Sequence, residues 1–139
     1  MQPDDRQEPG VPRTHLDVAA SFDVPVSAAW QLLTDTRTWP RWGPTITAVE
    51  TDPPVIVAGS TGRLRTPVGL WLPFVVTALE PGARWSWRVA GVPATGHRVE
   101  ATPDGCRIVF EVPVVAAPYA AVCRLALRRI GRLLAAGPS

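Results

Sequence analysis

The chain contains no lysine, and all fourteen of its basic residues are arginine. This absence excludes any mechanism that needs a lysine amine as a Schiff-base nucleophile or as a general base. Histidine and cysteine are also scarce, with two of each in 139 residues. Cys106 and Cys123 stand singly in apolar surroundings, so we expect two buried thiols, no metal site and a reducing compartment.

Charge and long apolar runs are scarce as well. The net charge is only +2, which predicts no strong field for nucleic acid. No apolar run approaches the length of a membrane span, so no integral membrane association is expected. The chain does not open with a basic and then apolar leader, which favours a cytoplasmic protein. The segment "GSTG" lacks the lysine and the helix of a phosphate-binding loop, and we expect no cofactor.

The polar, proline-rich opening "MQPDDRQEPGVPR" predicts a disordered tail over residues 1–13. The remaining residues 14–136 have the size of a single domain. From Thr14 to Val24 apolar and polar residues alternate, as in a half-buried strand.

Two short helices are expected directly after this strand. Ser27 is a good N-cap for a helix over "AAWQLLTD". The segment "TRTWPRW" predicts a second helical turn, which Pro40 and Gly43 end.

Six further strands are predicted between these helices and the C-terminal segment. They fall in "TITAVETD", "TGRLRTP", "LWLPFVVTALE", "RWSWRVAG", "HRVEAT" and "CRIVFEVP". The connections between them are mostly short, and "PDG" and "PGA" are strong turn sequences. Short connections favour antiparallel pairing.

The period then changes to that of a helix over residues 118–136. Its apolar side carries Cys123, Leu127, Ile130 and Leu134, whereas Arg124, Arg128 and Arg132 repeat on another side. The arginine stripe fits a solvated helix face or a contact with anionic lipid. At 1.5 Å per residue the helix is roughly 28 Å long, enough to cross a small sheet. The sequence therefore predicts an α+β fold, in which a curved seven-stranded antiparallel sheet wraps around this helix.

This order of elements resembles the START/Bet v 1-like (SRPBCC) superfamily, and most closely its polyketide cyclase/dehydratase-like branch. The resemblance rests on "VPVSAAWQLLTDTRTWPRWGP", "LEPGARWSWRV" and "GHRVEATPDGCRIVFE" and covers about residues 14–136. It implies a helix-grip fold with a deep hydrophobic cavity between the sheet and the C-terminal helix. Members bind lipids, hormones or polyketides, and some catalyse cyclisation, so the fold does not fix the function.

A cavity of roughly 300–1,000 Å³ is expected from strand parity and this resemblance. We expect its lining to include Trp39, Trp42, Leu72, Phe74, Trp87, His97, Phe110 and Leu127. The two tryptophans after the first helix either wall the entrance or simply plug that end of the sheet. Trp39 matches an aromatic residue that lines the pocket in aromatase/cyclase relatives.

Alternative roles are open for three charged or titratable residues. His97 shares the apolar face of its strand, where an imidazole either orients a ligand, acts as a general base or is hydrogen-bonded in the core. Arg63 and Arg65 either anchor an anionic ligand or lie exposed on the opposite face from Leu64.

The favoured function is a carrier or sensor that binds a small hydrophobic molecule. The alternative is a polyketide cyclase or dehydratase with His97 as its catalytic general base, and a third reading is a structural or interaction domain with a filled core. In cyclase relatives a strand arginine points into the pocket, but the corresponding "LWLPFVVTALE" is apolar on both faces apart from Thr77 and its terminal Glu80. That departure favours binding over catalysis. Whether the chain forms a homodimer stays an open question at this point.

Overall fold

The computed structural model describes residues 15–136, so the predicted tail over residues 1–13 lies outside the described residues. The elements, in chain order, are β1 (His15–Phe22), α1 (Val26–Thr34), α2 (Trp39–Trp42), β2 (Ala48–Thr51), β3 (Thr61–Arg65), β4 (Trp71–Glu80), β5 (Arg84–Val89), β6 (Val92–Thr102), β7 (Gly105–Pro113), the 3₁₀ helix η1 (Val114–Tyr119) and α3 (Ala120–Ala136). This is the predicted order of one strand, two short helices, six strands and a long helix.

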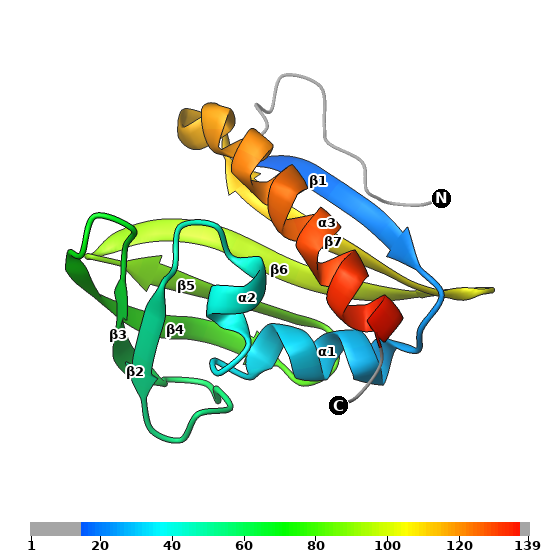
Figure 1. Cartoon of the computed structure of the whole chain (residues 1–139), viewed down its shortest axis with the longest axis horizontal. Coiled ribbons are helices and arrows are strands. Elements are labelled where there is room, and N and C mark those ends of the chain that lie inside the picture. Colours follow the sequence, from blue (N-terminus) through cyan, green and yellow to red (C-terminus); the bar gives the residue numbers. More distant parts are fainter. Residues whose placement is uncertain (1–14, 137–139) are drawn as a thin grey trace.

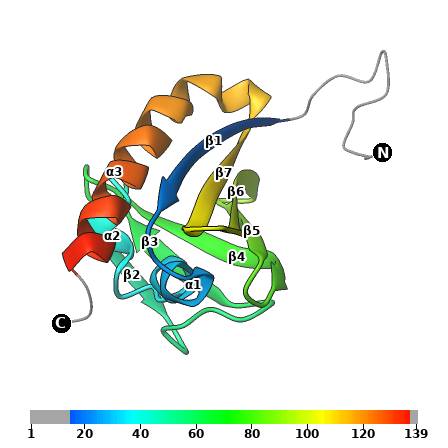
Figure 2. The same cartoon turned by 90° about the vertical axis from the view of Figure 1, so that its right-hand side faces the viewer.

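The strands form one seven-stranded sheet in the order β1-β7-β6-β5-β4-β3-β2, and every neighbouring pair is antiparallel. The sheet bends strongly, and α3 runs across its concave face over β1 and β7, as Figure 1 and Figure 2 show. The predicted α+β helix-grip architecture is therefore confirmed. In Figure 1 the helix α1 lies along the lower side of the sheet, and α2 lies in front of its central strands.

Short hairpin turns fix the register of the central strands. Between β5 and β6 the turn consists of Ala90 and Gly91 alone, since Val89 pairs with Val92. Both turn residues have positive φ angles, 52° and 78°, as the tightest hairpin turns require.

The helix α3 buries the face that its apolar period predicts. Cys123, Leu127 and Ile130 are buried, Leu134 is half-buried, and both cysteines are free thiols. The helix begins at Ala120, two residues later than expected. The preceding residues form η1, a 3₁₀ stretch that contains Pro118 and a non-helical Ala116.

The first short helix also starts differently from the expectation. It begins at Val26 with Pro25 at the N-cap position, and no side chain caps it. Ser27 lies inside the first turn, so the prediction that it caps the helix was wrong. Proline fits there because its fixed φ suits the start of a helix and its missing N–H needs no partner.

An aromatic cluster joins α2 to the middle of the sheet. The ring of Trp39 is stacked on Trp85 at 5.3 Å and 3°. It lies edge-on to Trp87 at 5.3 Å and tilted against Phe74 at 5.8 Å. The Trp39 indole donates its hydrogen to the Leu33 carbonyl at 3.0 Å. Trp39 is thus a core residue that anchors α2, and it does not stand at an entrance.

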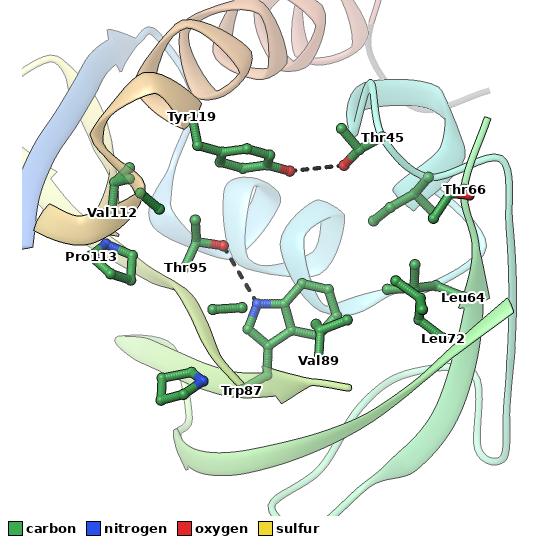
Figure 3. A pocket seen from close by; sticks show the side chains of 14 residues that line it. Thr45, Leu64, Thr66, Leu72, Trp87, Val89, Thr95, Val112, Pro113 and Tyr119 are labelled. Atoms are coloured by element: carbon green, nitrogen blue, oxygen red, sulfur yellow. Dashed lines mark hydrogen bonds between the residues drawn. The ribbon is translucent and has the colours of Figure 1, made fainter. Parts of the chain in front are cut away.

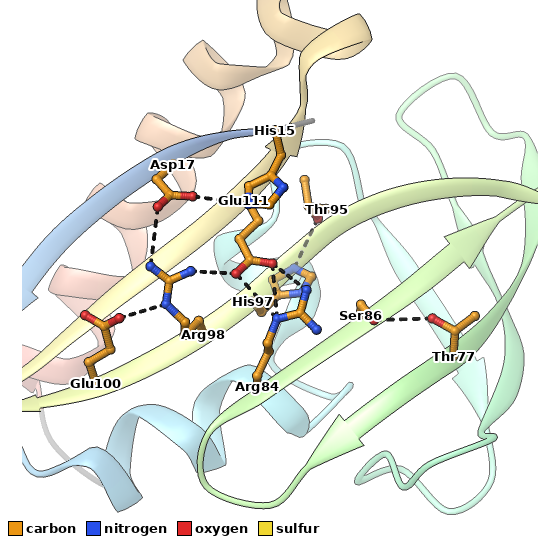
Figure 4. A network of polar contacts seen from close by, with 10 residues as sticks. All are labelled: His15, Asp17, Thr77, Arg84, Ser86, Thr95, His97, Arg98, Glu100 and Glu111. Atoms are coloured by element: carbon orange, nitrogen blue, oxygen red, sulfur yellow. Dashed lines mark hydrogen bonds and ion pairs between the residues drawn. The ribbon is translucent and has the colours of Figure 1, made fainter. Parts of the chain in front are cut away.

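Polar side chains form a network on the outer face of the sheet, which is the face away from the aromatic cluster. Glu111 is buried between Arg84 and Arg98, whose guanidinium groups lie 2.6 and 2.5 Å from its carboxylate oxygens (Figure 4). Burial alone would raise the pKa of Glu111, but hydrogen bonds from these arginines hold it below its ordinary value. Because Phe110 and Val112 point the other way, this network is separated from the interior by the thickness of the sheet.

Candidate functional site

A cavity of about 270 Å³ lies between one end of the sheet and the start of the C-terminal helical segment. This main cavity is slightly smaller than expected. Its lining residues are Thr45, Ile46, Leu64, Thr66, Leu72, Trp87, Val89, Pro93, Ala94, Thr95, Val112, Pro113, Ala116 and Tyr119 (Figure 3). Pro93 is exposed, so the cavity opens to solvent at that end.

The local sequence explains why this end of the fold is hollow. The helix α3 covers the sheet only from Ala120 onward, and the preceding segment "VVAAPY" crosses the remaining space as a single irregular 3₁₀ stretch. Ala94 from β6 and Ala116 from η1 face the gap with single methyl groups. Small side chains on both sides leave room that the larger residues of a core would fill.

Few polar atoms line the main cavity, and none of its lining residues is charged. The hydroxyls of Tyr119 and Thr45 are hydrogen-bonded at 2.8 Å across the gap between η1 and the loop after α2 (Figure 3). Burial raises the pKa of Tyr119, so its hydroxyl is protonated at neutral pH. On the sheet, the Trp87 indole donates to the Thr95 hydroxyl at 3.4 Å.

A second, smaller hollow of about 40 Å³ adjoins the main cavity on the side of α2. This inner recess shares Thr45, Ile46, Trp87, Thr95 and Tyr119 with the main cavity. Its other lining residues are Trp39, Trp42, Gly43, Pro44, Trp85, His97, Phe110, Val122, Cys123 and Ala126. A space of this size holds about one or two water molecules.

His97 lines this recess, where aromatic rings surround it. Its ring is stacked on Trp85 at 3.9 Å, and its Nε2 atom lies 3.2 Å from the Thr95 hydroxyl. The side chain is almost fully buried, and this desolvation lowers its pKa to about 3. His97 is therefore neutral at physiological pH and a weak base.

The eight residues that the sequence predicted for one cavity fall into three groups in the structure. Leu72 and Trp87 line the main cavity, whereas Trp39, Trp42, His97 and Phe110 line the inner recess together with Trp87. Phe74 and Leu127 line neither space. Phe74 is buried against Trp39 and Trp87, and Leu127 is buried in the interface of α3 with the sheet.

Several lining residues were not expected. Thr45 follows α2 in an irregular segment, whose side-chain directions no period predicts. Tyr119 falls within the predicted helix over residues 118–136, but in the structure it ends η1. Arg63 and Arg65 lie on the exposed face of β3, opposite the lining residue Leu64. They do not reach into the main cavity.

The buried imidazole makes a pH-dependent contribution to stability. Because the pKa of His97 is about 3 in the folded protein and 6.5 ordinarily, the unfolded chain takes up a proton first as the pH falls. We expect protonation of His97 in the unfolded chain to lower the free energy of unfolding by about 2 kcal/mol at pH 5 relative to neutral pH. A His97→Phe variant should lose that much less on acidification, measured by urea denaturation at pH 7.5 and pH 5. Equal losses in variant and wild type would contradict the burial of a neutral imidazole.

The family model described as "Polyketide cyclase / dehydrase and lipid transport" matches residues 13–136. The chain belongs to this family, which confirms the superfamily indicated by its sequence. Among curated proteins, the uncharacterized protein Rv2574 of Mycobacterium tuberculosis is 33% identical over an alignment of 90 residues, and the match covers 58% of this chain and 53% of that protein. The chain thus spans about half the length of the curated relatives it matches.

Solved structures share the fold at low sequence identity. Protein MLL2253 from Mesorhizobium loti superposes with a TM-score of 0.72 at 14% identity, covering 90% of this chain and 99% of the other. The AHSA1-like protein from Aeromonas hydrophila gives 0.66 at 17% identity, covering 88% and 92%. At these identities the likeness extends to the fold alone. None of the helices among residues 15–136 has the length and apolarity needed to cross a bilayer.

Proposed function

We propose that the protein binds a small, neutral, mainly apolar molecule in the main cavity. The observation that carries this proposal is an open cavity of about 270 Å³ lined by aliphatic and aromatic side chains. Such a volume stands at the lower limit of the usual range for ligand pockets, roughly 300–1,000 Å³. It suits a compact ligand such as a bicyclic ring system.

The ligand should carry no charge inside the cavity. A buried charge costs several kcal/mol unless a partner of opposite sign accompanies it. The lining residues include no arginine, aspartate or glutamate, and the Tyr119 hydroxyl keeps its proton. A carboxylate or phosphate would find no counter-charge.

A single hydroxyl or carbonyl group on the ligand would find partners. The Thr95 hydroxyl accepts from Trp87 and also contacts His97, and the Tyr119 and Thr45 hydroxyls meet across the cavity. A few hydroxyls in an apolar lining fix the orientation of a ligand and add specificity.

The alternative function, cyclisation or dehydration with His97 as general base, receives less support. An effective general base has a pKa near the working pH, whereas that of His97 is about 3. The imidazole lines the inner recess rather than the main cavity, and the Thr95 hydroxyl lies against its Nε2 atom.

Three matched probes test the proposal by equilibrium dialysis: 2-naphthol, naphthalene and 2-naphthoate. We expect 2-naphthol to bind in the micromolar range, since apolar burial at about 25 cal/mol per Å² suffices for that affinity. Naphthalene should bind roughly three- to tenfold more weakly, the value of one hydrogen bond. The charged 2-naphthoate should bind at least about tenfold more weakly than 2-naphthol.

A Thr95→Val variant should remove part of the preference for 2-naphthol over naphthalene. Thr102→Val, in the same strand but outside both hollows, is the matched control and should keep it. Failure of all three probes to bind would argue against the proposed function. Tighter binding of 2-naphthoate would instead contradict the neutrality of the ligand.

A further inference from the structure

Exposed aliphatic side chains gather around the opening of the main cavity. Val115 is 96% exposed, Val68 88%, Val92 62%, Leu70 58% and Val114 41%. We call these five residues the rim surface.

Each part of the rim surface adjoins residues that line the main cavity. Val68 and Leu70 lie in the loop that begins with the lining residue Thr66, and Val92 precedes the lining residue Pro93. Val114 and Val115 stand between two lining residues of the β7–η1 segment. The exposed positions therefore surround the cavity instead of being scattered over the molecule.

The sheet register brings these three segments to one end of the molecule. The β3–β4 loop and the β5–β6 turn both leave the sheet at that end, because Arg65 pairs with Trp71 and Val89 with Val92. The end of β7 lies beside the start of β6, since Gly96 pairs with Glu111. In Figure 1 the two connections lie at the left of the molecule, and the gold-orange residues that precede α3 lie above them.

The three segments themselves contain no charged residue, and the strand and helix residues that flank them add arginines. Residues 63–73, 86–96 and 112–124 contain four arginines and no aspartate or glutamate. Arg63 is paired with Glu50 at 2.7 Å and also lies over the Trp71 ring at 4.3 Å. For Arg65, Arg88 and Arg124, no ion pair is found within residues 15–136.

We propose that the rim surface docks on an anionic lipid bilayer, with its aliphatic side chains in the interfacial region and the arginines near the lipid headgroups. Aliphatic tips with arginines in the flanking strands and helix are complementary to such a surface. The half-buried Trp71 beside Leu70 adds a residue type that favours the membrane–water interface. A fluid surface can accept separate tips around a hollow, whereas a protein partner needs a continuous complementary patch.

This docking would place the opening of the main cavity against the hydrocarbon, where apolar molecules collect. The inference does not require the proposed ligand, because the rim surface is defined by its exposed residues and by charge. Membrane binding and cavity binding are therefore tested separately.

Co-sedimentation of the full chain with large unilamellar vesicles tests the docking. We expect binding to equimolar phosphatidylcholine and phosphatidylglycerol, much weaker binding to phosphatidylcholine alone, and weakening as salt is raised. A valine buried in an apolar phase contributes roughly tenfold to a binding constant. The double variant Val68→Asp/Val115→Asp should therefore bind at least about tenfold more weakly.

The matched control is Val57→Asp, at a 52% exposed position in the β2–β3 loop at the other end of β3. It should bind vesicles as the wild type does. Absence of binding to the anionic vesicles, or equal losses in the rim and control variants, would overturn the proposal. So would a wild-type dimer in light scattering that the rim variant dissociates, because the rim surface would then be a contact between two copies of the chain.

Discussion

A Leu127→Asp variant is expected to be unfolded at neutral pH and room temperature. Leu127 is 4% exposed and lies on the face of α3 that covers the sheet. The substitution removes about 2–5 kcal/mol of packing and buries a carboxylate. The other buried residues of α3, Ala120, Cys123, Ala126 and Ile130, are all uncharged. The combined loss is comparable to the whole stability of a small domain, about 5–15 kcal/mol.

Circular dichroism and urea denaturation measure this effect. Arg128→Asp is the matched control, because it introduces the same carboxylate at the next, exposed position of the helix. It should stay folded, with a stability within about 1 kcal/mol of the wild type. A Leu127→Asp protein that melts at the wild-type temperature would show that α3 does not bury this face.

An Ala94→Trp variant is expected to lose binding of 2-naphthol by about 100-fold or more while remaining folded. Ala94 lines the main cavity with a methyl group, and an indole at this position would occupy a large part of the space a ligand needs. Overpacking destabilises a filled core by about 1–3 kcal/mol, and the cost should be smaller where a cavity already exists.

Equilibrium dialysis with 2-naphthol and urea denaturation measure the two effects separately. Ala101→Trp adds the same side chain to an exposed position of the same strand, and it should bind as the wild type does. If Ala94→Trp retained wild-type affinity, the probe would be bound elsewhere.

The element order and the antiparallel sheet could be predicted because each depends on local signals. Alternation marks the strands, a sequence such as "PDG" marks a turn, and the period of the last helix identifies its buried residues. The start of α3 was less predictable. Tyr119 continues the apolar pattern of the helix, but in the structure it ends the 3₁₀ stretch η1.

The candidate site was only partly predictable, because strand parity gives the face of a residue and not its position along the sheet. Leu72 and Phe74 share a face of β4, yet one lines the main cavity and the other is buried beneath Trp39. The difference depends on where α2 and α3 cover the sheet, which is a property of the whole fold. The contact between Thr45 and Tyr119 spans 74 residues between two irregular segments, and no local pattern indicates it.

The chemical role of His97 could likewise be predicted only in part from the sequence. Its parity correctly placed it on the inner face, where an imidazole near an apolar cavity suggests a general base. Near-complete burial then lowers its pKa to about 3, and part of that burial comes from Trp85, which stacks on the imidazole from twelve positions away along the chain. A lone histidine in the sequence does not reveal that environment.

The central claim, that the main cavity holds a small neutral apolar molecule, is tested most directly by native mass spectrometry of freshly purified protein. We expect a fraction of the wild-type protein to carry a bound small molecule that denaturation releases. The Ala94→Trp variant should carry none, and Ala101→Trp should match the wild type. A wild-type protein that carries no molecule and gains no mass with excess 2-naphthol, or a molecule retained equally by Ala94→Trp, would contradict the claim.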